Sequence, residues 1–240
     1  MRPETDKLKF GRAKPLRTRI WIALLANPVV GRILAKLTYR PATREDVHKY
    51  WMEPWDGINL PQEYAGAKAR TQFLVQIVSR HADPPARILE VGCNVGRNLN
   101  ALFEAGYRGL LAGIEISRDA VRLMKETYPA MAAAAQIYNA AVEDVVRGFG
   151  DRAFDLVFTM AVLEHIHTSS EWVFPEIARI TNRYLVTIED ERGYSWRHFP
   201  RNYQRVFEPL GFRQIEQITC KEIEGLGKDF IARVFVRPNA

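Results

Sequence analysis

Apolar and polar positions follow a repeating pattern from residue 86 onwards. Five short, almost continuously apolar runs predict β-strands at residues 86–91, 110–116, 135–141, 154–160 and 183–189. Between most of them, apolar residues recur every three or four positions, which predicts helices around Leu99–Phe103, Ala120–Met124 and Val173–Ile180. Buried strands that alternate with helices indicate a parallel sheet covered on both faces.

The C-terminal pattern differs from this alternation. Residues 212–220 and 229–236 form two successive strand-like segments joined by a short loop. Such a connection makes the two strands antiparallel. We therefore predict an α/β fold, a Rossmann-like doubly wound seven-stranded sheet that is mostly parallel with the last strand antiparallel, plus an N-terminal helical extension.

The pattern also divides the chain into three parts. Residues 1–42 form a basic amphipathic extension, residues 43–85 a helical cap and lead-in helix, and residues 86–240 the α/β core. Pro54 and Gly57 prevent a long helix in the cap. A lead-in helix follows Pro61, with Thr71, Leu74 and Val78 on one face.

Charge is distributed unevenly along the chain. Residues 1–40 contain ten Lys and Arg side chains against two acidic ones, so the whole net charge of +6 originates there. This extension is predicted to be a basic helix, with two interpretations: it binds an anionic membrane surface, or it packs as a lid with solvated charges. Its apolar run is too short to span a bilayer. The slightly acidic remainder argues against a nucleic-acid partner.

The two cysteines, Cys93 and Cys220, are too few and too far apart to indicate a disulfide framework or a metal cluster. The sequence thus predicts no metal site. It also predicts a cytoplasmic protein, with peripheral binding at the inner face of the membrane as the alternative that the basic extension raises.

A glycine-containing turn follows the first strand, in the sequence ILEVGCNVGRNLN at residues 88–100. Gly92 and Gly96 allow the backbone to approach a ligand closely, and the following helix begins with N–H groups that favour a negative group. Asn94 stands where a dinucleotide fingerprint has a glycine. Glu115 lies at the end of the second strand. Its separation along the sequence from the first strand is about that of an acid that binds ribose hydroxyls.

Three segments together resemble the class I S-adenosylmethionine-dependent methyltransferases. They are ILEVGCNVGRNL, then GIEIS, then FDLVFTMAVLEHIH, and the resemblance covers roughly residues 62–238. It implies S-adenosylmethionine as cofactor and methyl transfer by in-line displacement to a small-molecule, glycan-linked or lipid-linked acceptor, with oxygen as the expected methylated atom.

The resemblance also implies roles for individual residues. The predicted cofactor site comprises Glu90, Gly92, Asn94, Gly96, Asn98, Glu115, Ile116, Asn139, Glu143, Met160 and Ala161. Within it, Glu115 holds the ribose, Ile116 flanks the adenine, Asn139 or Glu143 faces the adenine edge, and Asn98 lies near the cofactor's carboxylate. Met160 and Ala161 pass beside its sulfur.

A hydroxyl acceptor must lose a proton, and a base within hydrogen-bond reach assists that step. His198 and Glu189 are the favoured bases, and His165 is a candidate with a structural or substrate-lining role as its alternative. Two other functions compete with methyl transfer. One is a nicotinamide-dependent oxidoreductase that uses the same crevice, and the other is a non-catalytic adaptor with the methyltransferase fold.

Overall fold

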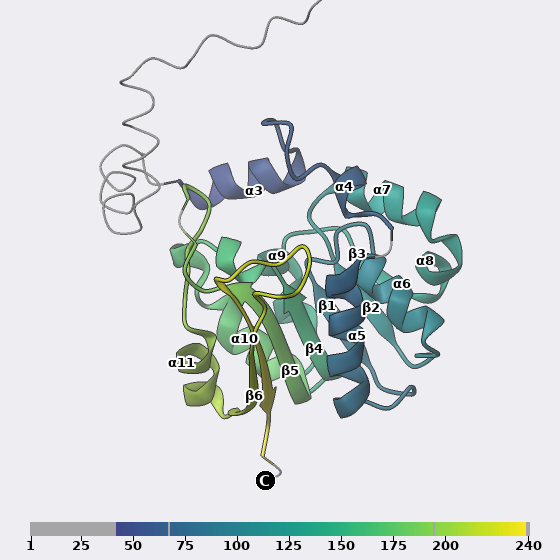
Figure 1. Ribbon diagram of the computed structural model, residues 1–240, viewed down its shortest axis with the longest axis vertical. Coiled ribbons are helices and arrows are strands. Elements are labelled where there is room, and N and C mark those ends of the chain that lie inside the picture. The colour runs from purple at the N-terminus through teal and green to yellow at the C-terminus, as the bar shows by residue number, and fades with distance from the viewer. Residues whose placement is uncertain (1–41, 67, 194, 239–240) are drawn as a thin grey trace, which may run out of the picture. The chain divides into compact units, whose positions relative to one another are not determined.

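One seven-stranded sheet forms the centre of the computed structural model, which describes residues 42–66, 68–193 and 195–238 (Figure 1). The strands are β1 (Ile88–Val91), β2 (Leu111–Ile114), β3 (Gln136–Tyr138), β4 (Phe154–Met160), β5 (Thr181–Asp190), β6 (Arg213–Thr219) and β7 (Phe230–Val236). Their spatial order is β3-β2-β1-β4-β5-β7-β6, and β7 is antiparallel to both its neighbours. The predicted fold class is confirmed.

Helices connect most of these strands. The α-helices of the described residues are α3 (Arg44–Met52), α4 (Pro61–Tyr64) and α5 (Ala69–His81), which precede β1, and α6 (Arg97–Glu104), α7 (Arg118–Thr127), α8 (Pro129–Ala134), α9 (Val142–Val145), α10 (Val173–Ile180) and α11 (Tyr203–Phe207). Short 3₁₀ helices are η1 (Val146–Gly148), η2 (Leu163–His165), η3 (Thr168–Ser170) and η4 (Glu208–Leu210). As predicted, α7 begins after Ser117, whose hydroxyl accepts a hydrogen bond from Ala120 N at 3.3 Å.

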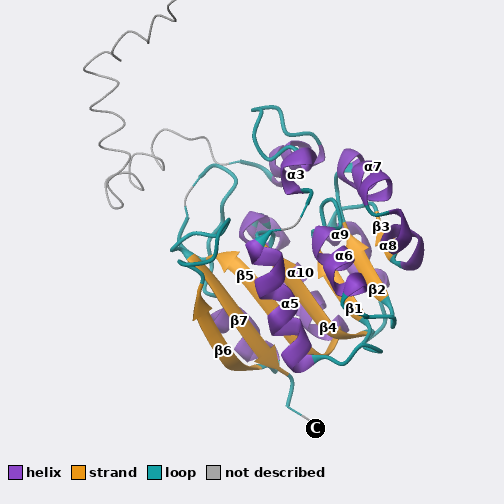
Figure 2. Cartoon of the chain, turned by 45° about the vertical axis from the view of Figure 1, so that its right-hand side comes forward, coloured by secondary structure: helices purple, strands orange, loops and turns teal. Residues whose placement is uncertain are grey.

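The strands bury side chains on both faces of the sheet, as their continuous apolar runs predict. Successive residues of a strand point to opposite faces. Leu89 and Val91 of β1 join a core cluster with residues of α10 and α11, whereas Ile88 joins a second cluster with residues of α5 and α6. Figure 2 shows α5 and α10 on opposite sides of the sheet.

The direction of the chain across the sheet reverses at β1. From β1 the chain passes outward to β2 and β3, and then returns to β4 on the other side of β1. In open α/β sheets, ligands bind at the carboxyl ends of the strands at such a reversal. The loops after β1, β2 and β4 meet there, and α3 lies beyond this edge of the sheet (Figure 1).

The cap is held against the core by aromatic contacts. α3 begins with a capping box formed by Thr43 and Asp46. The Tyr50 side chain on α3 is fully buried, and its ring centroid lies 5.0 Å from that of Trp55 and 5.4 Å from that of Trp196 in the loop after β5.

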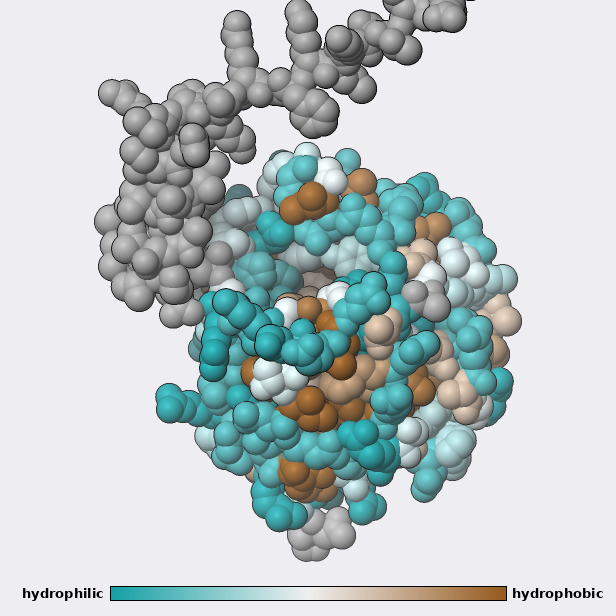
Figure 3. All heavy atoms as spheres, in the orientation of Figure 1, coloured by the Kyte–Doolittle hydropathy of each residue, from teal (hydrophilic) through white to brown (hydrophobic). Residues whose placement is uncertain are grey.

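Figure 3 shows that the face viewed in Figure 1 is mostly hydrophilic, with hydrophobic side chains near its centre and on the cap.

The predicted basic helix of the N-terminal extension lies outside the described residues, so both interpretations of it stay predictions. The division at residues 42 and 85 likewise stays a prediction. Within the described ranges, every helix is too short or too polar to cross a membrane.

β3 is shorter than the predicted run of residues 135–141. It contains three residues, because the chain turns at Asn139 and its side-chain Nδ2 donates to Glu115 O at 2.8 Å. The Asn139 side chain thus connects the turn after β3 to the end of β2. β2 is also shorter than predicted, because it ends at Ile114 rather than at Ile116.

Candidate active site

The turn between β1 and α6 consists largely of residues in the left-handed conformation. Gly92 has φ of 73°, Asn94 has 47° and Gly96 has 70°. Asparagine tolerates this region better than most non-glycine residues, so the missing middle glycine does not disrupt the turn. A Cβ on Gly92 would lie 2.3 Å from Val162 Cγ2, because the loop after β4 packs directly against the turn.

The acid at the end of β2 lies against this turn. Glu115 is 6% exposed, and its Oε2 accepts from Asn94 N at 2.7 Å while its Oε1 accepts from Ser117 N at 2.7 Å. Burial raises the pKa of Glu115 to about 7, although these hydrogen bonds act in the opposite direction. One carboxylate therefore joins the loops after β1 and β2.

A buried polar network lies beneath the turn. Glu90 Oε1 accepts from Asn98 Nδ2 at 2.7 Å, and Thr71 Oγ1 on α5 donates to Asn98 Oδ1 at 2.8 Å. Glu90 Oε2 is buried and has no hydrogen-bond partner among the described residues. Burial raises the pKa of Glu90 to about 8. A cation placed at Oε2 would satisfy the unpaired oxygen.

Arg97 was not predicted as a site residue, although its position is unusual. It is the first residue of α6, where the helix dipole disfavours a cation. Arg97 is 8% exposed, and its guanidinium donates to three neutral oxygens, those of Thr71, Tyr64 and Asn98. Burial, and next the charge of Arg70, lower the pKa of Arg97 to about 10. The sequence signal that could have identified Arg97 is a basic residue at the first position of a helix.

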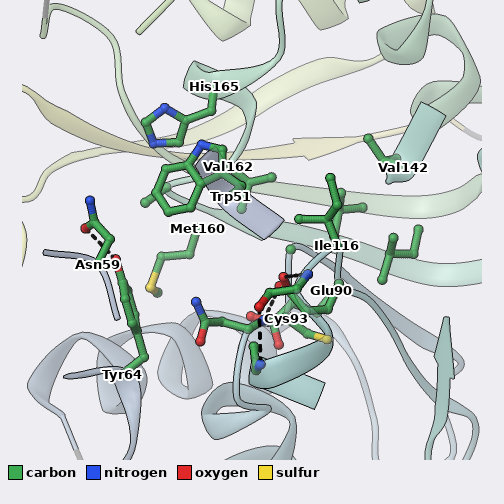
Figure 4. A pocket seen from close by; sticks show the side chains of 18 of the residues that line it. Trp51, Asn59, Tyr64, Glu90, Cys93, Ile116, Val142, Met160, Val162 and His165 are labelled. Atoms are coloured by element: carbon green, nitrogen blue, oxygen red, sulfur yellow. Dashed lines mark hydrogen bonds between the residues drawn. The ribbon is translucent and has the colours of Figure 1, made fainter. Parts of the chain in front are cut away.

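These groups surround one cavity of about 330 Å³ at the carboxyl ends of β1, β2 and β4 (Figure 4). Ligand sites in proteins occupy roughly 300–1,000 Å³. Of the predicted site residues, the cavity is lined by Glu90, Gly92, Asn94, Asn98, Glu115, Ile116, Glu143, Met160, Ala161, His165 and His198. The three loops thus converge as expected from their places in the sheet.

Three predicted site residues do not line the cavity. A Cβ on Gly96 would meet Met124 and Met131 at 2.7 Å, so this glycine serves helix packing instead. Asn139 is exposed and bonds to backbone carbonyls, whereas Glu143 reaches the cavity and lies 3.1 Å from His48 Nε2. Of the two candidates for the adenine edge, the structure therefore places only Glu143 at the cavity.

Glu189 is the third of these residues. It is fully buried and accepts from Thr159 Oγ1 at 2.6 Å and from Val162 N at 2.9 Å. Burial raises its pKa well above the usual range. The side chain braces the loop after β4, and the structure does not support its predicted use as a base.

Two histidines and a glutamate form one wall of the cavity. Glu164 and His165 belong to η2, and His198 comes from the loop after β5. Glu164 Oε1 lies 3.6 Å from His165 Nε2 and 3.6 Å from His198 Nε2. Burial lowers the pKa of both imidazoles, that of His165 most strongly, and raises the pKa of Glu164 to about 8.

Aromatic side chains cover this wall. The Trp51 ring lies 4.6 Å from the His165 ring, and Trp51 Nε1 is buried without a hydrogen-bond partner in the described part of the chain. Arg197 stacks over the Tyr50 ring at 4.5 Å and lines the cavity. Ring contacts join Tyr50 to Trp51, Trp55 and Trp196. Arg197 was not predicted to bind a ligand.

Comparison with known proteins agrees with this geometry. The sequence model of a methyltransferase domain matches residues 89–183. A comparison with curated proteins found no match.

Solved structures share the fold. Magnesium protoporphyrin IX methyltransferase from Synechocystis, solved with bound S-adenosylhomocysteine, is 15% identical, with a TM-score of 0.64 over 81% of this chain and 99% of that chain. Geranyl diphosphate C-methyltransferase from Streptomyces coelicolor is 11% identical, with a TM-score of 0.60 over 82% and 98%. The match of residues 89–183 to a methyltransferase domain and the shared fold agree with the predicted resemblance to class I methyltransferases.

Proposed function

We propose that this chain, a methyltransferase of the class I fold, binds S-adenosylmethionine in the cavity and methylates an oxygen of a small-molecule, glycan-linked or lipid-linked acceptor. The observation that carries the proposal is the convergence of the Gly92 turn, Glu90 and Glu115 on one cavity. The two acidic side chains and the glycine turn, at which the backbone can approach a ligand closely, match what the two ends of this cofactor require.

The nucleoside end of the cofactor fits the loops after β2 and β3. Glu115 is the acid in position for the ribose hydroxyls, and its two oxygens each retain acceptor capacity beyond one backbone hydrogen bond. Ile116 supplies an apolar surface for the adenine. We assign the adenine edge to Glu143 rather than Asn139, because only Glu143 reaches the cavity.

The amino-acid end fits the network beneath the turn. The unpaired Glu90 Oε2 is a partner for the cofactor's ammonium group. Arg97 and Arg70 both line the cavity, and the hydrogen bonds of Arg97 go to neutral oxygens. We therefore assign the cofactor's carboxylate to these guanidinium groups. Asn98, predicted for that role, bonds Glu90 instead and holds it in place.

When bound, S-adenosylmethionine would supply its sulfonium methyl group: the acceptor oxygen would bond to the methyl carbon as the carbon–sulfur bond breaks, with S-adenosylhomocysteine as the leaving group and loss of the acceptor's proton. The chain's contribution is mainly to position the reactants, which is worth roughly 7–11 kcal/mol in favourable cases. Apolar Met160 and Ala161 line the same cavity as Glu90 and the histidine wall. They keep carboxylates off the reaction centre, where a negative charge would stabilise the cation in the ground state.

The acceptor is proposed to bind between the histidine wall and the aromatic cap. Trp51 Nε1 and the Arg197 guanidinium are donors at that end of the cavity, and Arg197 Nε is buried without a partner among the described residues. These donors favour an oxygen-rich acceptor. The imidazoles of His165 and His198 are then the groups beside the hydroxyl that loses its proton.

Calorimetric titration with S-adenosylhomocysteine tests the proposal, and binding to one site per chain is expected. A folded protein that binds reduced nicotinamide dinucleotide instead would favour the oxidoreductase. A protein that binds neither ligand would favour the adaptor.

The affinity for S-adenosylmethionine is expected to rise with pH between 6 and 8. Glu115 and Glu90 have pKa values raised to about 7 and about 8, so both carry protons at pH 6. The cofactor requires the ionised carboxylates, because they accept from its hydroxyls and pair with its ammonium. With a pKa of about 7, Glu115 is ionised in roughly a tenth of molecules at pH 6 and nine tenths at pH 8, which predicts at least about tenfold tighter binding.

Calorimetry in two buffers of different ionisation enthalpy measures both the affinity and the protons released. The Glu115→Gln variant should show a shallower pH dependence of any binding that remains. An affinity that stays constant from pH 6 to 8, without proton release, would contradict the assignment of these two acids.

We further propose that the basic residues 1–40 attach the protein to anionic membranes, since they carry all of the excess positive charge. The full-length protein is expected to co-sediment with vesicles containing phosphatidylserine and to stay in the supernatant with phosphatidylcholine alone. Equal sedimentation with both kinds of vesicle would contradict attachment to anionic membranes and would favour the lid interpretation.

A further inference from the structure

The histidine wall has the arrangement of a ligand set. Glu164 and His165 follow β4, and His198 lies 33 residues beyond His165 in the loop after β5. One ligand atom from each residue lies within 4.8 Å of the ligand atoms of the other two. All three residues line the cavity, and Glu164 is nearly fully buried at 2% exposure.

The hydrogen bonds of His165 leave the lone pair of its Nε2 facing the carboxyl group of Glu164. His165 Nδ1 lies 2.8 Å from Arg197 O, and a carbonyl oxygen only accepts, so Nδ1 carries the proton. In the neutral ring Nε2 then presents a lone pair. It faces Glu164 Oε1 at 3.6 Å, which is too long for a hydrogen bond. A cation between the two atoms would bind both.

Each of the three side chains is also fixed on the side away from the cluster. Arg197 O holds His165 Nδ1, Ser195 Oγ holds His198 Nδ1, and Asp190 N donates to Glu164 Oε2. Metal-binding histidines and carboxylates characteristically have such outer-shell partners, which orient the ring and fix its tautomer. The cluster is therefore oriented for binding rather than satisfied within itself.

We propose that Glu164, His165 and His198 bind a divalent transition-metal ion, of the class of Zn²⁺, Co²⁺ or Fe²⁺, at the acceptor end of the cavity. Two imidazoles and one carboxylate suit these ions, whereas Mg²⁺ and Ca²⁺ prefer oxygen ligands alone. The ligand atoms of a tetrahedral Zn²⁺ stand roughly 3.4 Å apart, at bonds of about 2.0–2.1 Å. The two separations of 3.6 Å are close to that value.

The site uses no cysteine, which is why the spacing of Cys93 and Cys220 gave no sign of it. Three protein ligands leave coordination positions open, as in catalytic rather than structural metal sites. Because the ligands line the cavity, the open positions are available to the acceptor.

This assignment deepens the proposed function and rests on it for its role in catalysis. An acceptor hydroxyl bound to the ion has a lowered pKa and loses its proton more readily. His165 and His198 then act as ligands rather than as bases, and the hydroxyl bound to the ion would release its proton to water. The acceptor class is narrowed to molecules whose hydroxyl can bind a metal.

Titration of the metal-stripped, full-length protein with CoCl₂ and with ZnCl₂ tests the site without reference to activity. We expect one Zn²⁺ per chain by calorimetry and visible d–d absorption bands from Co²⁺ that Zn²⁺ displaces. His198→Ala and Glu164→Gln should each weaken Zn²⁺ binding by more than the roughly 10–100-fold that loss of an outer-shell partner costs. Circular dichroism confirms that the variants are folded.

His167→Asn is the matched control, because His167 lies two residues beyond His165 and outside the cluster. It should bind Zn²⁺ like the wild type. A folded wild type that binds neither ion, or Zn²⁺ binding that survives both ligand variants, would overturn the proposal. Binding of Mg²⁺ alone would contradict the class of ion.

A separate titration with S-adenosylhomocysteine distinguishes the two proposals. Cofactor binding without metal binding would remove only the metal site. Metal binding without cofactor binding would keep the site and remove the proposed methyl transfer.

Discussion

Replacing Glu115 by glutamine is expected to weaken S-adenosylhomocysteine binding at least about a hundredfold, because two hydrogen bonds to a charged group contribute roughly 3 kcal/mol or more. The carboxylate accepts only, and its position at the end of β2 allows it to take both ribose hydroxyls. Glutamine keeps the size of the side chain but turns one acceptor into a donor.

Isothermal titration calorimetry measures this effect, and thermal unfolding reports on the fold. Some loss of stability is expected, since Glu115 also accepts from Asn94 N and Ser117 N. Asp119→Asn is a control with the same change in charge, because Asp119 lies on the exposed side of α7 in an ion pair with Arg122. A Glu115→Gln protein that binds within threefold of the wild type would refute the ribose assignment.

Replacing Gly92 by alanine is expected to abolish measurable cofactor binding and to destabilise the protein. The left-handed backbone costs a non-glycine residue roughly 1–2 kcal/mol, and overpacking adds roughly 1–3 kcal/mol. The overpacking is specific, because the new Cβ would lie 2.3 Å from Val162 Cγ2. Relief of this contact must move the loop after β4, which forms part of the cavity.

A second substitution separates the two causes. Val162→Ala removes both γ-carbons that the new Cβ would meet, so the Gly92→Ala/Val162→Ala protein should recover the overpacking part of the lost stability but not the backbone part. Urea unfolding measures the recovery. If the double variant is no more stable than the sum of the two single variants predicts, the close contact is not the cause.

Much of the fold could be predicted because it depends on local patterns. Strand β4 has the predicted bounds, and Ser117 caps α7 as expected. Short elements were missed: α8 and α9 have four to six residues, too few for a helical period to be recognised. The turn at Asn94 was also harder to assess, since its left-handed conformation is visible only in the backbone.

The candidate site was predictable in part for the same reason. Parallel strands bring their carboxyl ends to one edge, so Gly92, Glu115 and Met160 had to lie near one another once the strands were identified. The direction of each side chain was not predictable. Glu189 lies one residue before the end of β5, and its side chain points into the core, where Thr159 Oγ1 and Val162 N donate hydrogen bonds to its oxygens.

The sequence by itself determined the strands, the helices and the loops that reach the cavity, because apolar spacing and glycine positions act over a few residues. Only the tertiary structure decided which distant side chains meet. Glu164 and His198 are 34 residues apart, and they face each other because the loop after β5 packs beneath the aromatic side chains of α3. Contacts of this kind depend on packing between segments, which no local pattern encodes.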